Sequence, residues 1–164
     1  MADYFTKTAF EIKVTAAEAA LLHECLDVAS TLFDIEDEVS LTGVASQLST
    51  AFRQTFPAIA GDSFASFRGL FVDPDFPEFG VSLTVRCQGD DSAVLVFSGE
   101  QVHVDAVARL IRKVCKSALP FSFSWASTCS RMRPGEFGGG YFVITDQDII
   151  GGSTDDLIRQ ALKK

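Results

Sequence analysis

The sequence predicts an α+β fold, with an antiparallel sheet of about four to five strands and helices mainly on one face. Two observations lead to this prediction. Segments in which apolar and polar residues alternate, as in strands, stand before and after segments whose apolar residues recur at helical spacing. In addition, residues 88–91 have the composition of a hairpin turn between two strand-like segments, and a hairpin pairs its strands antiparallel.

The N-terminal part is predicted to form a strand and two helices. Within residues 5–14, the apolar residues Phe10, Ile12 and Val14 alternate with Glu11 and Lys13, which is typical of a half-buried strand. Thr15 and Glu18 then form a capping-box pattern, which predicts a helix that begins there and runs to about Phe33. A second helix is predicted over residues 41–56, because the apolar residues there share one helical face and a proline follows.

Residues 57–80 have no regular pattern and are rich in phenylalanine. We expect most of these rings to belong to the core that covers the sheet. The alternative is that a minority of them form an exposed anchor patch beside the acidic side chains of residues 73–78. The five rings are Phe64, Phe67, Phe71, Phe76 and Phe79.

The C-terminal part is predicted to hold four strands and two helices. Strands are expected over residues 81–87, 93–97, 121–126 and 141–145, with a long turn at 127–140, and helices from Asp105 to Pro120 and from Ser153 to Lys164. The first of these helices carries four basic residues on its outer face, toward the end where the helix dipole favours cations. They are Arg109, Arg112, Lys113 and Lys116.

We expect all these elements to form a single domain, residues 1–164, because no linker or low-complexity tract divides the chain. It comprises a strand with two helices at 1–56, the Phe-rich irregular segment at 57–80, and a β-β-α-β-β-α unit at 81–164. Hydrophobic residues make up 47% of the chain and the mean hydropathy is +0.20. Such a composition supports a full core without disulfides or metals and argues against disorder.

The charge is negative overall and unevenly distributed. The net charge is −8, with 16 acidic and 5 basic residues in 1–100 against 6 acidic and 9 basic residues in 101–164. This balance argues against direct binding of nucleic acid, which requires a basic face. The acidic surface serves either solubility or docking on a basic partner. The candidate docking residues are Asp34, Glu36, Asp37, Glu38, Asp73, Asp75 and Glu78.

The cysteines and histidines predict no metal site and no cofactor. Four widely separated cysteines and two histidines show none of the paired spacings that zinc sites use. Cys25 and Cys115 fall on apolar helical stripes and are expected in the core. Cys129 lies next to a loop rich in arginine and glycine that could lower its pKa, but neither histidine is near it in sequence to act as a base. The sequence therefore leaves enzymatic activity open and favours its absence.

Residues 127–140 form the only segment whose composition suggests a ligand. Two arginines stand before three consecutive glycines, whose exposed amides could help to hold an anion. The segment lacks the Gly-Lys-Ser/Thr end of a phosphate-binding loop, and a strand rather than a helix follows it. The other interpretation is a wide hairpin connection in which an arginine pairs with Glu136. The candidate residues are Cys129, Ser130, Arg131, Arg133, Glu136, Gly138, Gly139 and Gly140.

Residues 123–140, followed by Val143-Ile144-Thr145, resemble the C-terminal signature of uncharacterised small proteins from phages, plasmids and proteobacterial genomes. The similarity also takes in Pro77-Glu78-Phe79-Gly80-Val81 and covers roughly residues 76–146. That family brings no activity, cofactor or site residue with it. The resemblance implies a cytoplasmic protein that is encoded on a mobile element.

No apolar run reaches the ~18–20 residues of a membrane-spanning helix, and the N-terminus lacks a signal-peptide pattern, so a cytoplasmic location without membrane contact is expected. We predict a non-enzymatic acidic binding protein, an anti-defence type of inhibitor that docks on a basic surface of a host protein complex. One alternative is a small-ligand or anion-binding protein, or an enzyme, that uses residues 127–140. Another is a module that forms a homodimer through an edge strand or the Phe-rich segment.

Overall fold

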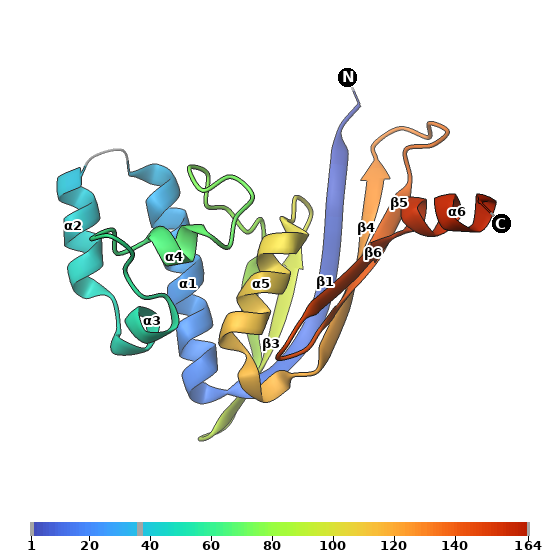
Figure 1. Cartoon of the computed structure of the whole chain (residues 1–164). Helices are drawn as coiled ribbons and strands as arrows, with labels where there is room; N and C mark the ends of the chain where they lie inside the picture. Colours follow the sequence, from blue (N-terminus) through green and yellow to red (C-terminus); the bar gives the residue numbers. More distant parts are fainter. Residues whose placement is uncertain (1, 36–37, 164) are drawn as a thin grey trace.

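The computed structural model describes residues 2–35 and 38–163 (Figure 1). One antiparallel sheet of six strands has the order β2-β3-β1-β4-β5-β6. The strands are β1 (Tyr4–Thr15), β2 (Ser82–Gln88), β3 (Ser92–Gly99), β4 (Phe121–Cys129), β5 (Gly138–Ile144) and β6 (Ile149–Ser153). The helices are α1 (Ala16–Asp34), α2 (Glu38–Gln47), α3 (Thr50–Thr55), α4 (Ala65–Arg68), α5 (Val104–Val114), the 3-10 helix η1 (Lys116–Ala118) and α6 (Thr154–Leu162). The predicted α+β class is confirmed, with slightly more strands than expected.

The long strand β1 joins the two halves of the sheet. Its first residues, Tyr4 to Lys7, pair with β4, and its later residues, Thr8 to Thr15, pair with β3. Ile12 and Val14 are buried against the helices, while the alternate residues Glu11, Lys13 and Thr15 are exposed. The alternation of apolar and charged residues in the sequence therefore predicts the buried and the exposed face of this strand correctly.

Helices α1 and α5 lie over one face of the sheet (Figure 1). Helices α2, α3 and α4 stand on the far side of α1, away from the strands, and the arm formed by β5, β6 and α6 extends on the opposite side of the molecule. No residue of α6 is buried, although its sequence is amphipathic. The core thus lies between the sheet and α1 and α5, and it continues into the small helices.

Phenylalanine rings fill the space between the small helices and the sheet. Phe64, Phe67, Phe71 and Phe79 are buried, whereas Phe76 is 62% exposed. The ring of Phe67 is at the centre, with four other rings whose centroids lie 5.2–6.2 Å away. The expectation that most of these rings belong to the core is confirmed, and one ring is exposed beside the acidic side chains. An anchor patch for a partner stays a prediction.

The prediction of a single helix over residues 41–56 is wrong, because the chain breaks between α2 and α3. Ser49 caps α3, and its side chain accepts a hydrogen bond from the Phe52 amide. The carboxylate of Glu24 in α1 holds this cap, since it accepts from the Ser49 amide at 2.7 Å and from the Ser49 hydroxyl at 2.5 Å. A partner 25 positions away therefore stabilises the break.

The strand β6 is missing from the prediction, and the turn predicted at 127–140 is shorter than expected. β4 continues to Cys129 and β5 begins at Gly138, so only residues 130–137 connect them. Likewise, the helix predicted from Asp105 to Pro120 ends at Val114, after which residues 116–118 form η1. Local periodicity placed these elements, but the ends of the strands depend on their pairing with neighbouring strands.

Glu18 links the start of α1 to η1. The predicted capping box is confirmed: Thr15 accepts from the Glu18 amide, and Glu18 accepts from the Thr15 amide. Glu18 also accepts from the Ser117 amide at 2.8 Å and from the Ser117 hydroxyl. Burial alone would raise the pKa of Glu18, but the hydrogen bonds from Ser117 and Thr15 outweigh it and leave the pKa below its ordinary value.

We expect Glu18→Gln to lower the free energy of unfolding by about 1 kcal/mol at neutral pH, because a neutral amide accepts weaker hydrogen bonds than a carboxylate. The pKa is lower in the folded than in the unfolded chain, so the carboxylate stabilises the fold fully above the unfolded value near 4.5. This contribution is lost as the pH falls through the folded pKa. Urea unfolding of both proteins across this range measures the difference, and a difference that persists in strong acid contradicts the assignment.

Candidate functional site

The structure brings two of the predicted acidic segments together. Phe33, next to the last residue of α1, contacts Phe76 edge to face, with ring centroids 6.3 Å apart. Asp34 follows the first of these rings, and Asp75 precedes the second. Segments about forty positions apart in the chain therefore share one surface, in which aromatic rings stand among carboxylates. We call Phe33, Asp34, Asp73, Asp75, Phe76 and Glu78 the acidic surface.

A groove of about 500 Å³ adjoins the acidic surface, between α1 and the chain that leads into β2. Phe33 and Glu78 belong to both the surface and the groove. The lining contains one carboxylate and no lysine or arginine: Leu26, Ala29, Ser30, Phe33, Pro77, Glu78, Phe79, Gly80, Val81, Ser82 and Gln101. The groove is therefore mainly apolar with a negative rim.

The loop that carries the acidic surface is held in place by local hydrogen bonds. Asp73 accepts from the amide of Asp75 at 3.1 Å through its side chain and from the amide of Phe76 at 3.2 Å through its carbonyl. Such a turn lifts the Phe76 ring away from the core, where it is 62% exposed. Glu78 lies 3.9 Å from the imidazole of His103. Among the described residues, no lysine or arginine forms an ion pair with these loop carboxylates.

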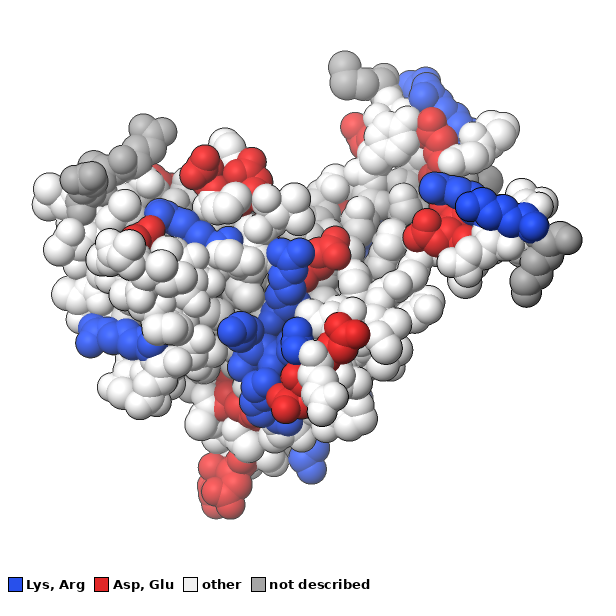
Figure 2. Space-filling model, in the orientation of Figure 1, with Lys and Arg blue, Asp and Glu red and all other residues white. Residues whose placement is uncertain are grey.

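The predicted acidic docking residues occupy two neighbouring segments. Asp34 is exposed at the end of α1, and Asp73, Asp75 and Glu78 are exposed in the loop. Glu36 and Asp37 lie outside the described residues. Glu38 is the first residue of α2, and its side chain is also outside the description. In the view of Figure 2, acidic side chains gather at the tip of the loop before β2.

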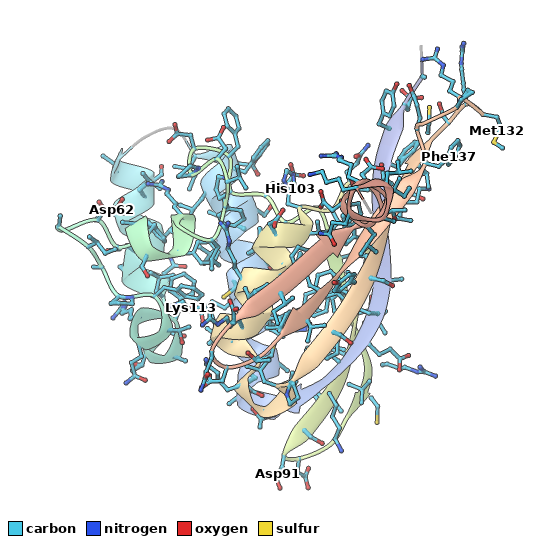
Figure 3. All side chains as sticks on the ribbon, turned by 45° about the vertical axis from the view of Figure 1, so that its right-hand side comes forward. Asp62, Asp91, His103, Lys113, Met132 and Phe137 are labelled. Atoms are coloured by element: carbon cyan, nitrogen blue, oxygen red, sulfur yellow. The ribbon has the colours of Figure 1, made fainter. Side chains whose placement is uncertain are left out.

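The segment predicted as an anion loop is the β4–β5 hairpin. Cys129 is buried at the end of β4, opposite Tyr4. Ser130 donates its amide to the Asp3 carbonyl and accepts from the Asp3 amide, which ties the hairpin to the N-terminus. Arg131 and Arg133 are exposed in the turn, beside Met132, which is 91% exposed (Figure 3).

Glu136 is the polar centre of this hairpin. Hydrogen bonding with the Tyr4 hydroxyl and the Cys129 thiol lowers the pKa of Glu136. The Oε2 atom of Glu136 is buried and has no hydrogen-bond partner among the described residues. The hydrogen bond to Glu136 raises the pKa of Tyr4, and the nearby negative charge acts in the same direction. The positive charge of Arg133 lowers the pKa of Glu136 further.

The glycines that the sequence places in the loop belong to strand β5, and one of them, Gly140, packs against an aromatic ring. Gly138, Gly139 and Gly140 pair with residues of β4, and Gly140 also pairs with Ser153 of β6. A Cβ atom on Gly140 would lie 2.6 Å from the indole ring of Trp125. Similar contacts with the rings of Phe142 and Tyr141 hold at Gly151 and Gly152. Close approach of a ring or of a neighbouring strand accounts for Gly139, Gly140, Gly151 and Gly152, but not for Gly138. Anion binding by the hairpin stays a prediction.

Of the two rings in the acidic surface, the sequence indicated the exposure of Phe76 but not that of Phe33. Phe76 lies between two prolines in a turn with three acids, a composition that hinted at exposure. Phe33 gave no signal, because it lies on the predicted helix and its exposed neighbour comes from a distant loop. Arg109, Arg112 and Lys113 lie on α5, as predicted, and Lys116 lies on η1. The structure adds that these four basic residues line a groove.

Comparison of the chain with family models, with curated proteins and with solved structures gives no match. The resemblance of residues 76–146 to proteins of mobile elements stays a prediction. Among residues 2–35 and 38–163, no three His, Cys, Asp or Glu side chains are grouped in a way that could hold a metal ion. No helix in the same residues has the length and apolar character needed to cross a membrane.

Proposed function

We propose that this chain is a protein-binding module whose acidic surface docks on a basic segment of a partner protein. The observation that carries the proposal is the contact between Phe33 and Phe76, which joins two acidic segments around exposed rings. Aromatic anchors among charges are the composition of binding surfaces, because the rings supply apolar area and the charges select the partner.

The adjoining groove fits the same role. Its apolar lining and negative rim suit a basic side chain with a long aliphatic stem, whose charged end would reach Glu78. Among the described residues, these exposed carboxylates have no lysine or arginine partner, so their charge stays available for a partner protein. We infer that the partner is a host protein complex with a basic surface and that the chain acts as an inhibitor by occupying it. A mobile-element setting, which the resemblance of residues 76–146 implies, would suit such a role.

The test is to capture a partner from a nuclease-treated bacterial lysate on the immobilised protein. The amount of partner retained is compared between the wild type and two charge-reversal variants. Asp75→Lys/Glu78→Lys changes the acidic surface and leaves Asp73, whose carboxylate holds the turn. The matched control is Asp90→Lys/Asp91→Lys, which makes the same change of charge in the β2–β3 hairpin at the opposite end of the molecule (Figure 3).

We expect the wild-type protein and the hairpin control to retain the same partner at low salt and to release it as the salt concentration rises. The variant of the acidic surface should retain at least tenfold less, since two attractive charges become repulsive. Phe76→Ala should also weaken retention, with little effect on stability because the ring is largely exposed. Equal retention by both reversal variants would remove the acidic surface from the proposal.

A further inference from the structure

We infer that a second site, a basic groove on the outer side of α5, binds a small molecule that carries a phosphate or diphosphate group. The groove has a volume of about 350 Å³ and lies between α4, α5 and the β5–β6 turn. Its lining residues are Ser66, Gly69, Leu70, Arg109, Arg112, Lys113, Lys116, Asp146 and Ile149. Figure 2 shows the basic side chains as a continuous stripe over α5.

The helix brings the four cations to one side. Arg109, Arg112, Lys113 and Lys116 follow each other at helical spacing, so they share a face of α5 and its extension into η1. The helix dipole favours the cations of the last turn, Arg112 and Lys113, but it does not act on Arg109, which lies near the middle of the helix. The position of this arginine therefore calls for a different explanation.

The two arginines are oriented by backbone carbonyls, which leaves their positive charge without a bonded carboxylate. Arg109 donates to the Leu70 carbonyl at 3.1 Å. Arg112 donates to the carbonyls of Asp146 and Gln147. Each guanidinium carries five N–H donors, so some remain for a ligand, and the carbonyl bonds fix the direction in which they point.

Lys113 is the free cation of the groove. Among the described residues no hydrogen bond or ion pair is found for its ammonium group, and it lies on the side of α5 turned toward the segment around α4 (Figure 3). Lys116 pairs with Asp146 at 2.7 Å, so one carboxylate faces four cations. By contrast, Lys7, Arg68, Arg86 and Arg159 each pair with a carboxylate elsewhere in the described residues.

This excess of positive charge stands on a chain whose net charge is −8. Preorganised arginines beside a free lysine are the donors that phosphate groups require, because they combine directed N–H bonds with a mobile charge. The small volume and the negative charge of the rest of the molecule favour a small phosphate compound over a nucleic-acid chain. The inference does not depend on the acidic surface, which belongs to other residues.

The test is calorimetric titration of the whole protein with pyrophosphate and with adenosine diphosphate. We expect saturable binding to the wild-type protein and at least a tenfold weaker affinity for Lys113→Glu, because a direct charge contact becomes repulsive. Lys113 bonds to no other group among the described residues, so we expect this variant to fold as the wild type does. Without ligand it should unfold only slightly below the wild-type temperature, because the last turn of the helix loses a cation that the dipole favours. Lys13→Glu makes the same change in β1, away from the groove, and should bind as the wild type does.

Each outcome decides for or against the phosphate site. Tighter binding of adenosine diphosphate than of pyrophosphate shows that the groove also contacts the rest of the ligand, and equal binding shows recognition of the diphosphate alone; both support the inference. If neither pyrophosphate nor adenosine diphosphate binds, the inference is overturned. It is also overturned if Lys113→Glu and Lys13→Glu lose the same affinity for diphosphate. If an oligonucleotide binds more tightly than adenosine diphosphate, and its affinity increases with its length, the groove binds a polymer and the inference is overturned. Asp75→Lys/Glu78→Lys should bind diphosphate as the wild type does, which separates this site from the proposed function.

Discussion

Replacing Phe67 with alanine is expected to lower the free energy of unfolding by about 3–5 kcal/mol. The side chain is fully buried, and its ring contacts those of Phe52, Phe56, Phe71 and Phe79. Removing the ring at the centre of this cluster leaves a cavity that the neighbours, held on separate elements, can fill only in part. Chemical denaturation with both proteins measures the loss.

Phe76→Ala is the matched control, since it removes the same ring from the same segment at an exposed position. We expect a change below about 1 kcal/mol for this variant, because less apolar surface leaves water on folding. Similar losses for the two variants would contradict the assignment of Phe67 to the core and of Phe76 to the surface. The comparison therefore also supports the use of Phe76→Ala in binding experiments.

Replacing Gly140 with alanine is expected to lower the free energy of unfolding by about 3 kcal/mol. The added methyl group would overlap the Gly152 carbonyl oxygen in β6 and lie 2.6 Å from the Trp125 ring in β4. Since Gly140 lies in β5 between these two strands, neither neighbour can move without breaking the pairing of the sheet. Thermal and urea unfolding measure the effect.

Gly138→Ala provides the comparison within the same strand. A Cβ atom at Gly138 meets no other atom within 4 Å, so we expect a change of less than about 1 kcal/mol. If both variants lose the same stability, the clash is not the reason for the glycine at position 140. If the expected contrast is found, packing requires Gly140 and leaves Gly138 free for another role in the hairpin.

Local signals in the sequence determined the fold class and most of its elements. The alternation in β1 and the capping box of Thr15 and Glu18 involve residues within a few positions of one another, so the sequence displays them directly. The break before α3 does not follow from such signals, because Glu24 of α1 holds the Ser49 cap. The strand β6 was missed for a related reason: its glycines pack against rings of β5, and they interrupt the alternation by which strands are recognised.

For the candidate sites too, the sequence predicted some features, and only the tertiary structure decided the others. The sequence showed an acidic N-terminal part and four cations on one helix face, because charge and helical spacing can be read from the residues alone. Only the tertiary structure decided that Phe33 meets Phe76 and that the α5 cations line a groove with α4 and the β5–β6 turn. The physical reason is that a site consists of side chains from distant segments, and the packing of the core sets which of these segments become neighbours.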